Sequence, residues 1–178
     1  SEEELTEDYL YNNPLLGASP QEIFARKIAY NWWGGSLFFD YRSEIPWSED
    51  GFVNYTIYRM AKDTYGEAYA KENYVEVWER DVKLSPRNFY RRHPEYLEKL
   101  PATAESIVSA KLQPPDLSSR LALMLLDIEQ RVGGEAAFTE ILRDFYQDNA
   151  YKAVREQVKS TAFLAYCGLT LDDMDAYR

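Results

Sequence analysis

The sequence has few of the side chains that hold transition metals: it contains one histidine, His93, and one cysteine, Cys167. His93 directly follows two arginines, and neighbouring cations disfavour a bound metal ion, so we interpret it as a surface or capping residue. A single cysteine excludes a disulfide within the chain and leaves the redox compartment open. Cys167 ends an apolar segment, 162–167, which favours a buried, unreactive thiol over a nucleophile.

Basic charge and long apolar runs are also scarce. The 20 Lys and Arg side chains are outnumbered by 30 Asp and Glu, which gives a net charge of −10 and an acidic isoelectric point near 4.7. Nucleic-acid partners need a basic surface, so we do not expect one. No apolar stretch approaches the roughly 20 residues that span a bilayer, so we expect no membrane span in this chain. The sequence does not decide a cellular compartment.

The patterns that are present predict an all-α fold. Residues 1–18 are acidic and polar with an Asn-Asn-Pro sequence, which indicates an irregular lead-in, and residues 19–178 are expected to form one helical domain. Helices are predicted at 20–33, 49–66, 67–84, 116–132, 135–149 and 153–166, with a last short helix beginning at 169–173. A short extended piece is expected at 36–39. Five prolines break residues 86–115 into short helices at best.

The first predicted helix has an apolar repeat of four residues. Ser19 and Pro20 are a capping residue followed by a proline at the first helical position, and Glu22 completes a capping box. Phe24, Ile28 and Trp32 then recur every fourth residue, which predicts a buried stripe. We expect the helix to stop at the glycines of positions 34 and 35.

The segment ARKIAYNWWG, residues 25–34, resembles the zinc helix of the membrane alanyl aminopeptidase family of gluzincins, whose pattern is H-E-x-x-H-x-W-W/F-G. In that pattern the two histidines bind zinc from one helix face and the glutamate is the general base. The flanking aromatic and glycine residues match. The three functional positions correspond to Arg26, Lys27 and Tyr30, so the resemblance implies a domain that has lost its zinc ligands.

The family's third zinc ligand is a glutamate in an N-E-G-F-A-like sequence, and this chain has WSEDGFV at residues 47–53. Glu49 lies at the family's spacing from Tyr30, with eighteen residues between them, whereas Asp50 directly precedes Gly-Phe. Either carboxylate fits the position of the lost ligand. The carboxylate needs a counter-charge when no metal is bound, so we expect Arg26 to pair with Glu49 or Asp50. The alternative is that Arg26, Lys27 and Tyr30 are simply a polar helix face.

A later segment, SSRLAL at residues 118–123, resembles the family's Y-x-K-G-A-L sequence. Ser118 stands where the family has the tyrosine that stabilises the tetrahedral intermediate, and a serine cannot place a phenol there. Arg120 keeps a cation at the family's lysine position and is a candidate cleft cation. The resemblance covers about residues 20–178 and implies the helical C-terminal part of the catalytic domain, without the strand-rich half that precedes it.

These observations predict a non-catalytic, peptidase-like domain, without a catalytic residue, metal site or cofactor of its own. We expect it to bind a peptide or protein, or to support a neighbouring domain of the same polypeptide, with the cleft between the helices at 20–33 and 49–65 as the natural place. The alternative is part of an active zinc aminopeptidase whose ligands come from segments outside this chain. An aromatic binding surface that includes Tyr55, Tyr58 and Tyr69 is a further hypothesis.

Overall fold

A computed structural model describes residues 20–40, 43, 45, 47–84, 117–152 and 156–177. Of these residues 79% are helical, which confirms the all-α class. The elements, in chain order, are α2 (Pro20–Ser36), α3 (Glu49–Tyr65), α4 (Glu67–Ala70), the π-helical turn η1 (Lys71–Val75), α5 (Glu76–Leu84), α8 (Leu117–Arg131), α9 (Glu135–Asn149), α10 (Ser160–Tyr166) and the 3-10 helix η3 (Asp172–Tyr177).

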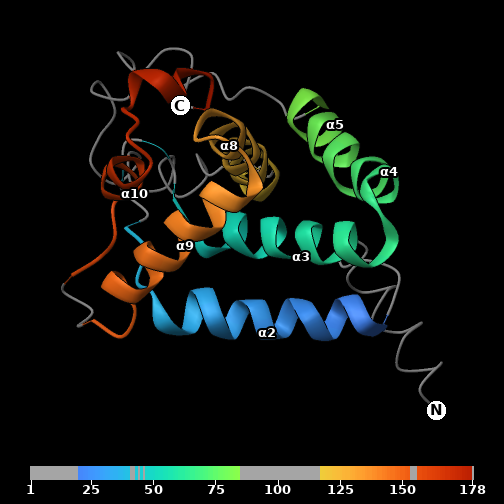
Figure 1. Cartoon of the computed structure of the whole chain (residues 1–178), viewed down its shortest axis with the longest axis horizontal. Helices are drawn as coiled ribbons and strands as arrows, with labels where there is room; N and C mark the ends of the chain where they lie inside the picture. The colour runs from blue at the N-terminus through green and yellow to red at the C-terminus, as the bar shows by residue number, and fades with distance from the viewer. Residues whose placement is uncertain are drawn as a thin grey trace, which may run out of the picture.

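Helix α3 is the centre of the arrangement. Figure 1 shows α2 running antiparallel beneath it, α8 and α9 on its other side, and α4 and α5 turning away from its C-terminal end. Phe52, on α3, is 1% exposed, and its ring lies 4.8 Å from that of Trp33 and 5.3 Å from that of Phe163. Helix α3 therefore joins residues from both ends of the chain in one aromatic core.

Acidic residues and glycines set both ends of α3 and the break between α8 and α9. Glu49 and Asp50 start α3, where negative charge is favourable to the helix dipole, and Gly66 ends it with a φ of 92°. Gly133 and Gly134, with φ values of 106° and 95°, separate α8 from α9. Such backbone angles favour glycine, so the predicted breaks at these three glycines are confirmed.

Three predicted boundaries need correction or refinement. Helix α2 continues through Gly34 and Gly35 to Ser36, since neither glycine adopts a positive φ. Of the helix predicted at 153–166, residues 153–155 lie outside the described residues, and α10 begins at Ser160 because Val158 forms a parallel bridge with Phe39. The helix predicted at 67–84 is present as α4, η1 and α5 in direct succession. Of the 36–39 stretch expected to be extended, Ser36 still belongs to α2 and Phe39 forms the bridge.

The predicted buried stripe of α2 is wrong. Phe24, Ile28 and Trp32 are 68%, 50% and 51% exposed. The side that packs on α3 instead carries Ala29 and Trp33, which are 1% and 6% exposed. The exposed and the buried residues both repeat every four positions along α2. The buried pair is shifted by one position toward the C-terminus, and this shift places it under α3.

The lead-in at 1–18, the capping Ser19, the stretch 86–115 with His93, and Asp116 lie outside the described residues.

Candidate functional site

The zinc-helix positions implied by the resemblance lie on α2, where it packs directly on α3. The indole Nε1 of Trp33 donates a hydrogen bond of 2.9 Å to Thr56 Oγ1, and the Trp33 ring stacks on Phe52. The position of a Cβ on Gly34 would lie 3.1 Å from Glu49 Cγ, so the two helices approach closely at this end. Side chains therefore fill the space between α2 and α3 around Trp33, where a cleft was expected.

Tyr30 and Asp50 come together across the two helices. The Tyr30 hydroxyl donates a short hydrogen bond to Asp50 Oδ1. Burial raises the pKa of Tyr30 well above its ordinary value, and the hydrogen bond and negative charge of Asp50 raise it further. The phenol thus stays protonated at neutral pH and donates its proton to the hydrogen bond with the Asp50 carboxylate. Of the two candidate acids, Asp50 is the one whose carboxylate meets position 30.

Arg26 lies one helical turn before Tyr30 and reaches one turn further along α3. Its Nη1 donates a hydrogen bond of 2.6 Å to Asn54 Oδ1, and its Nη2 is 3.9 Å from Glu22 Oε1. Glu22 is only 8% exposed and also forms a hydrogen bond with Tyr74. Burial, followed by this hydrogen bond, raises the pKa of Tyr74 above its ordinary value. The expected pairing of Arg26 with Glu49 or Asp50 is therefore replaced by pairing with Asn54 and Glu22.

The remaining positions implied by the resemblance are more scattered. Lys27 is exposed on α2. Ser118 and Arg120 are half-buried on α8, which crosses the start of α3 so tightly that a Cβ on Gly51 would lie 2.5 Å from Leu121 Cβ. The neighbouring Ser119, also on α8, donates a hydrogen bond of 3.2 Å from its hydroxyl to Asp81 Oδ2 on α5.

Sequence reasoning missed a second polar cluster, which joins α3, α8 and α9. Tyr55 donates a hydrogen bond of 2.5 Å to Glu129 Oε2 and accepts one of 2.7 Å from Arg59 Nη1. Arg59 Nη2 and Lys62 Nζ lie 2.6 and 3.1 Å from the Glu135 carboxylate. The contact between Tyr55 and Arg59 could have been predicted, because residues four apart on a helix are neighbours. The two acids could not, because they lie more than 70 residues further along the chain.

The aromatic-surface hypothesis does not hold for two of its three residues. Tyr55 and Tyr58 are buried, at 2% and 8% exposure, and only Tyr69 is open, at 40%. Tyr69 is paired with Tyr65, with 4.8 Å between ring centroids. Tyr55 and Tyr58 therefore serve the core, and no joint surface of the three exists.

Cys167 packs against the core, and burial raises the pKa of its thiol to about 12. This is the environment of an unreactive thiol, because the thiolate is the reactive form.

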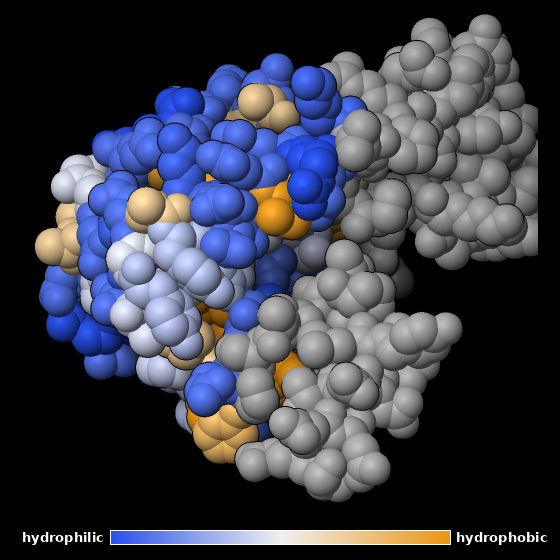
Figure 2. Space-filling model, turned by 90° about the vertical axis from the view of Figure 1, so that its right-hand side faces the viewer, coloured by the Kyte–Doolittle hydropathy of each residue, from blue (hydrophilic) through white to orange (hydrophobic). Residues whose placement is uncertain are grey.

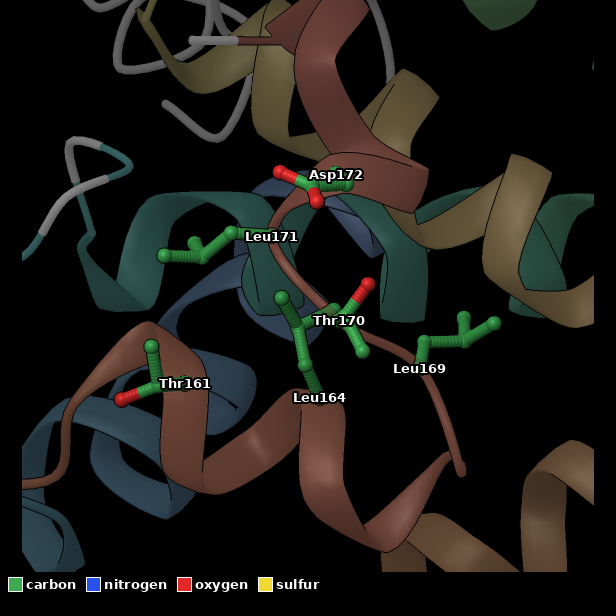
Figure 3. Close-up of a pocket in the computed structure, with 6 residues that line it drawn as sticks. All are labelled: Thr161, Leu164, Leu169, Thr170, Leu171 and Asp172. Atoms are coloured by element: carbon green, nitrogen blue, oxygen red, sulfur yellow. The ribbon is translucent and has the colours of Figure 1, made fainter.

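A pocket of 320 Å³ lies between α10 and η3 (Figure 3). Leu164, Leu169 and Leu171 form its apolar lining, and the polar lining comes from Thr161, Thr170 and Asp172. Its size is at the lower end of that of small-molecule sites. Asp173 next to it accepts hydrogen bonds from the amide and hydroxyl of Thr170, which fixes the turn into η3 and lowers the pKa of Asp173.

Two further properties concern the part of the chain that the structure describes. No group of three or more His, Cys, Asp and Glu side chains in this part of the chain is placed to hold a metal ion. None of the described helices has the length and apolar character needed to cross a bilayer.

Comparisons with protein-family models, with curated proteins and with solved structures give no match to this chain.

Proposed function

We propose that this chain is a non-catalytic, peptidase-like helical domain in which the positions of a former zinc site have become structural contacts between α2 and α3. The observation that carries the proposal is the hydrogen bond from Tyr30 to Asp50. Zinc is bound by imidazole, thiolate and carboxylate groups, whereas a protonated phenol beside a carboxylate is a hydrogen-bond donor. The same two positions that would hold zinc in the family here hold the helices together.

The contacts of Arg26 support the same proposal. A guanidinium stays charged at all ordinary pH values, so it cannot replace a neutral imidazole as a ligand. Its hydrogen bond to Asn54 and its ion pair with Glu22 place the charge between partners on both helices. The domain then acts as a binding or structural module. It has no peptidase activity because the residues at the zinc-ligand positions cannot bind the metal.

The first test measures zinc content and aminopeptidase turnover of the unmodified protein after incubation with zinc and desalting. We expect far less than one zinc per chain and no hydrolysis of aminoacyl-coumarinamide substrates. Stoichiometric zinc together with turnover would overturn the proposal, and would favour the alternative of an active metallopeptidase.

The second test rebuilds the motif. The variant Arg26→His, Lys27→Glu, Tyr30→His restores H-E-x-x-H on α2, and we expect it to bind about one zinc per chain with Asp50 as third ligand. Adding Asp50→Ala should abolish that binding, while adding Glu49→Ala should keep it. Circular dichroism checks that each variant is folded. A folded triple variant that binds no zinc would show that positions 26 and 30 are not a former metal site.

A further inference from the structure

The pocket between α10 and η3 offers an apolar surface to a small ligand. Leu164, which lines it from α10, is 1% exposed, and Leu169 and Leu171 are half-buried beside it. Figure 3 shows the side chain of Leu164 rising from α10 toward the segment that carries Leu171 and Asp172. An apolar group that enters this pocket is removed from water, which is favourable.

The backbone around the pocket is held in place before any ligand binds. Gly168, with a φ of 67°, turns the chain back after α10, and the amide of Leu169 donates a hydrogen bond of 2.9 Å to the Leu164 carbonyl. The amide of Met174, a residue that is 0% exposed, donates a hydrogen bond of 3.0 Å to the Leu171 carbonyl. A ligand therefore does not have to order these walls, which lowers the cost of binding.

The charge of the pocket comes from Asp172. Its side chain is exposed and makes no hydrogen bond or ion pair with another residue that the structure describes. The neighbouring Asp173, in contrast, accepts two hydrogen bonds from Thr170. Arg131 of α8, whose charge acts on Asp173, already forms an ion pair of 3.1 Å with Asp127. The pocket of this acidic chain therefore favours a cation over an anion.

Exposed acids alone do not make such a site. The end of the molecule at α4 is mostly hydrophilic, with only small separate hydrophobic spots (Figure 2). Four exposed acids lie on α4, η1 and the start of α5: Glu67, Glu72, Glu76 and Glu79. Asp172 differs because its carboxylate adjoins leucines that line a pocket. Charge and apolar lining together select a ligand that has both a cationic and an apolar part.

We propose that this pocket binds a compact organic amine. Its apolar part lies between Leu164 and Leu171, and its ammonium group lies beside the Asp172 carboxylate. The volume of 320 Å³ is at the lower end for small-molecule sites, which favours a compact ligand. The former zinc site is formed by α2 and α3, so binding at α10 and η3 does not depend on the function proposed above.

The first experiment compares three ligands that have similar apolar parts and different charges: 2-phenylethylamine, 2-phenylethanol and 3-phenylpropanoate. Nuclear magnetic resonance titrations of the isotope-labelled full chain at neutral pH give their dissociation constants. We expect the amide shifts to centre on Thr161, Leu164 and Leu171. The amine should bind about two- to fivefold more tightly than the alcohol, the usual effect of one exposed ion pair, and the anion should bind most weakly.

The second experiment tests the charge with matched variants. Asp172→Asn should remove the advantage of the amine over the alcohol and leave the binding of the alcohol unchanged. Asp63→Asn makes the same change at an exposed position of α3 and should leave both unchanged. Thr161→Phe places a ring in the pocket and should weaken the binding of all three ligands. Circular dichroism checks that each variant is folded.

Butylamine tests the apolar part of the ligand, because it carries the same charge on a chain like that of a lysine side chain. We expect it to bind more weakly than 2-phenylethylamine. Equal binding of these two amines, an amine that binds no more tightly than the alcohol, or the absence of binding overturns the proposal. Shift changes centred away from the pocket, binding that Thr161→Phe leaves intact, or an amine advantage that persists in Asp172→Asn also overturn it.

Discussion

Helices α2 and α3 have the same length, 17 residues each, but bury their side chains differently. Helix α3 is covered on most of its circumference, with eight buried residues that include the polar Asn54 and the aromatic Tyr55. Helix α2 is covered along one line and exposes an equally apolar line beside it. An apolar repeat thus identifies a surface that favours burial, while the neighbouring elements decide whether this chain buries it.

The largest expected effect tests that difference directly. Phe52→Ala in α3 removes a ring that is 1% exposed and contacts the rings of Trp33, Trp47 and Phe163. We expect it to lower the free energy of unfolding by about 3–5 kcal/mol, since both burial and packing are lost. Phe24→Ala in α2 makes the same chemical change at 68% exposure and should stay within about 0.5 kcal/mol.

Urea denaturation measures both values, because the free energy of unfolding falls linearly with the denaturant concentration. Equal losses for Phe52→Ala and Phe24→Ala would mean that Phe24 is buried in the folded chain as deeply as Phe52.

Much of the fold follows from local signals in the sequence. The bounds of α9 agree with the predicted 135–149, and α3 ends at Gly66 as expected, because acids at a helix start and glycines with positive φ act locally. The side of α2 that is buried could not be read in the same way. The lines through Ile28 and through Ala29 have the same period, and only the position of α3 selects between them.

The site was predictable only in part, for a related reason. Tyr30 and Asp50 were singled out by the resemblance, and the structure brings them together. The partners of Arg26 were missed because charge balance pointed to the acids of α3. On α3 its partner is the neutral amide of Asn54, and its acidic partner, Glu22, lies one turn earlier on α2 itself. The extension of α2 through Gly34 was missed because glycine permits a helix end without requiring one.

The next prediction compares how a glycine-to-alanine substitution changes stability in α3 and in α2. Gly51→Ala in α3 would place a Cβ 2.5 Å from Leu121 Cβ, so α3 and α8 must separate, and we expect a loss of about 1–3 kcal/mol. Gly35→Ala in α2 meets no atom within 4 Å and should be neutral or stabilising by up to about 1 kcal/mol, since alanine favours the helix. Thermal unfolding followed by circular dichroism gives the two signs, and a stabilising Gly51→Ala would contradict the close contact of α3 with α8.

The smallest effect concerns the polar side of α3 and appears at alkaline pH. Burial, followed by the hydrogen bond and charge of Glu129, raises the pKa of Tyr55 above its ordinary value. Below about pH 10 the folded and unfolded states both keep the Tyr55 proton, so this group adds no pH dependence. Above about pH 10 the unfolded state loses the proton while the folded state retains it, and the free energy of unfolding falls as the pH rises.

Tyr55→Phe removes this alkaline loss together with the hydrogen bond to Glu129. At neutral pH we expect it to cost about 1 kcal/mol, the net value of an ordinary hydrogen bond. Above about pH 10 its unfolding temperature should fall less steeply than that of the unmodified protein. Tyr65→Phe, at a tyrosine that is 52% exposed, is the control and should keep the original slope. Identical slopes for all three proteins would mean that Tyr55 ionises as readily in the folded state as in the unfolded one, which would be incompatible with its buried hydrogen bond to a carboxylate.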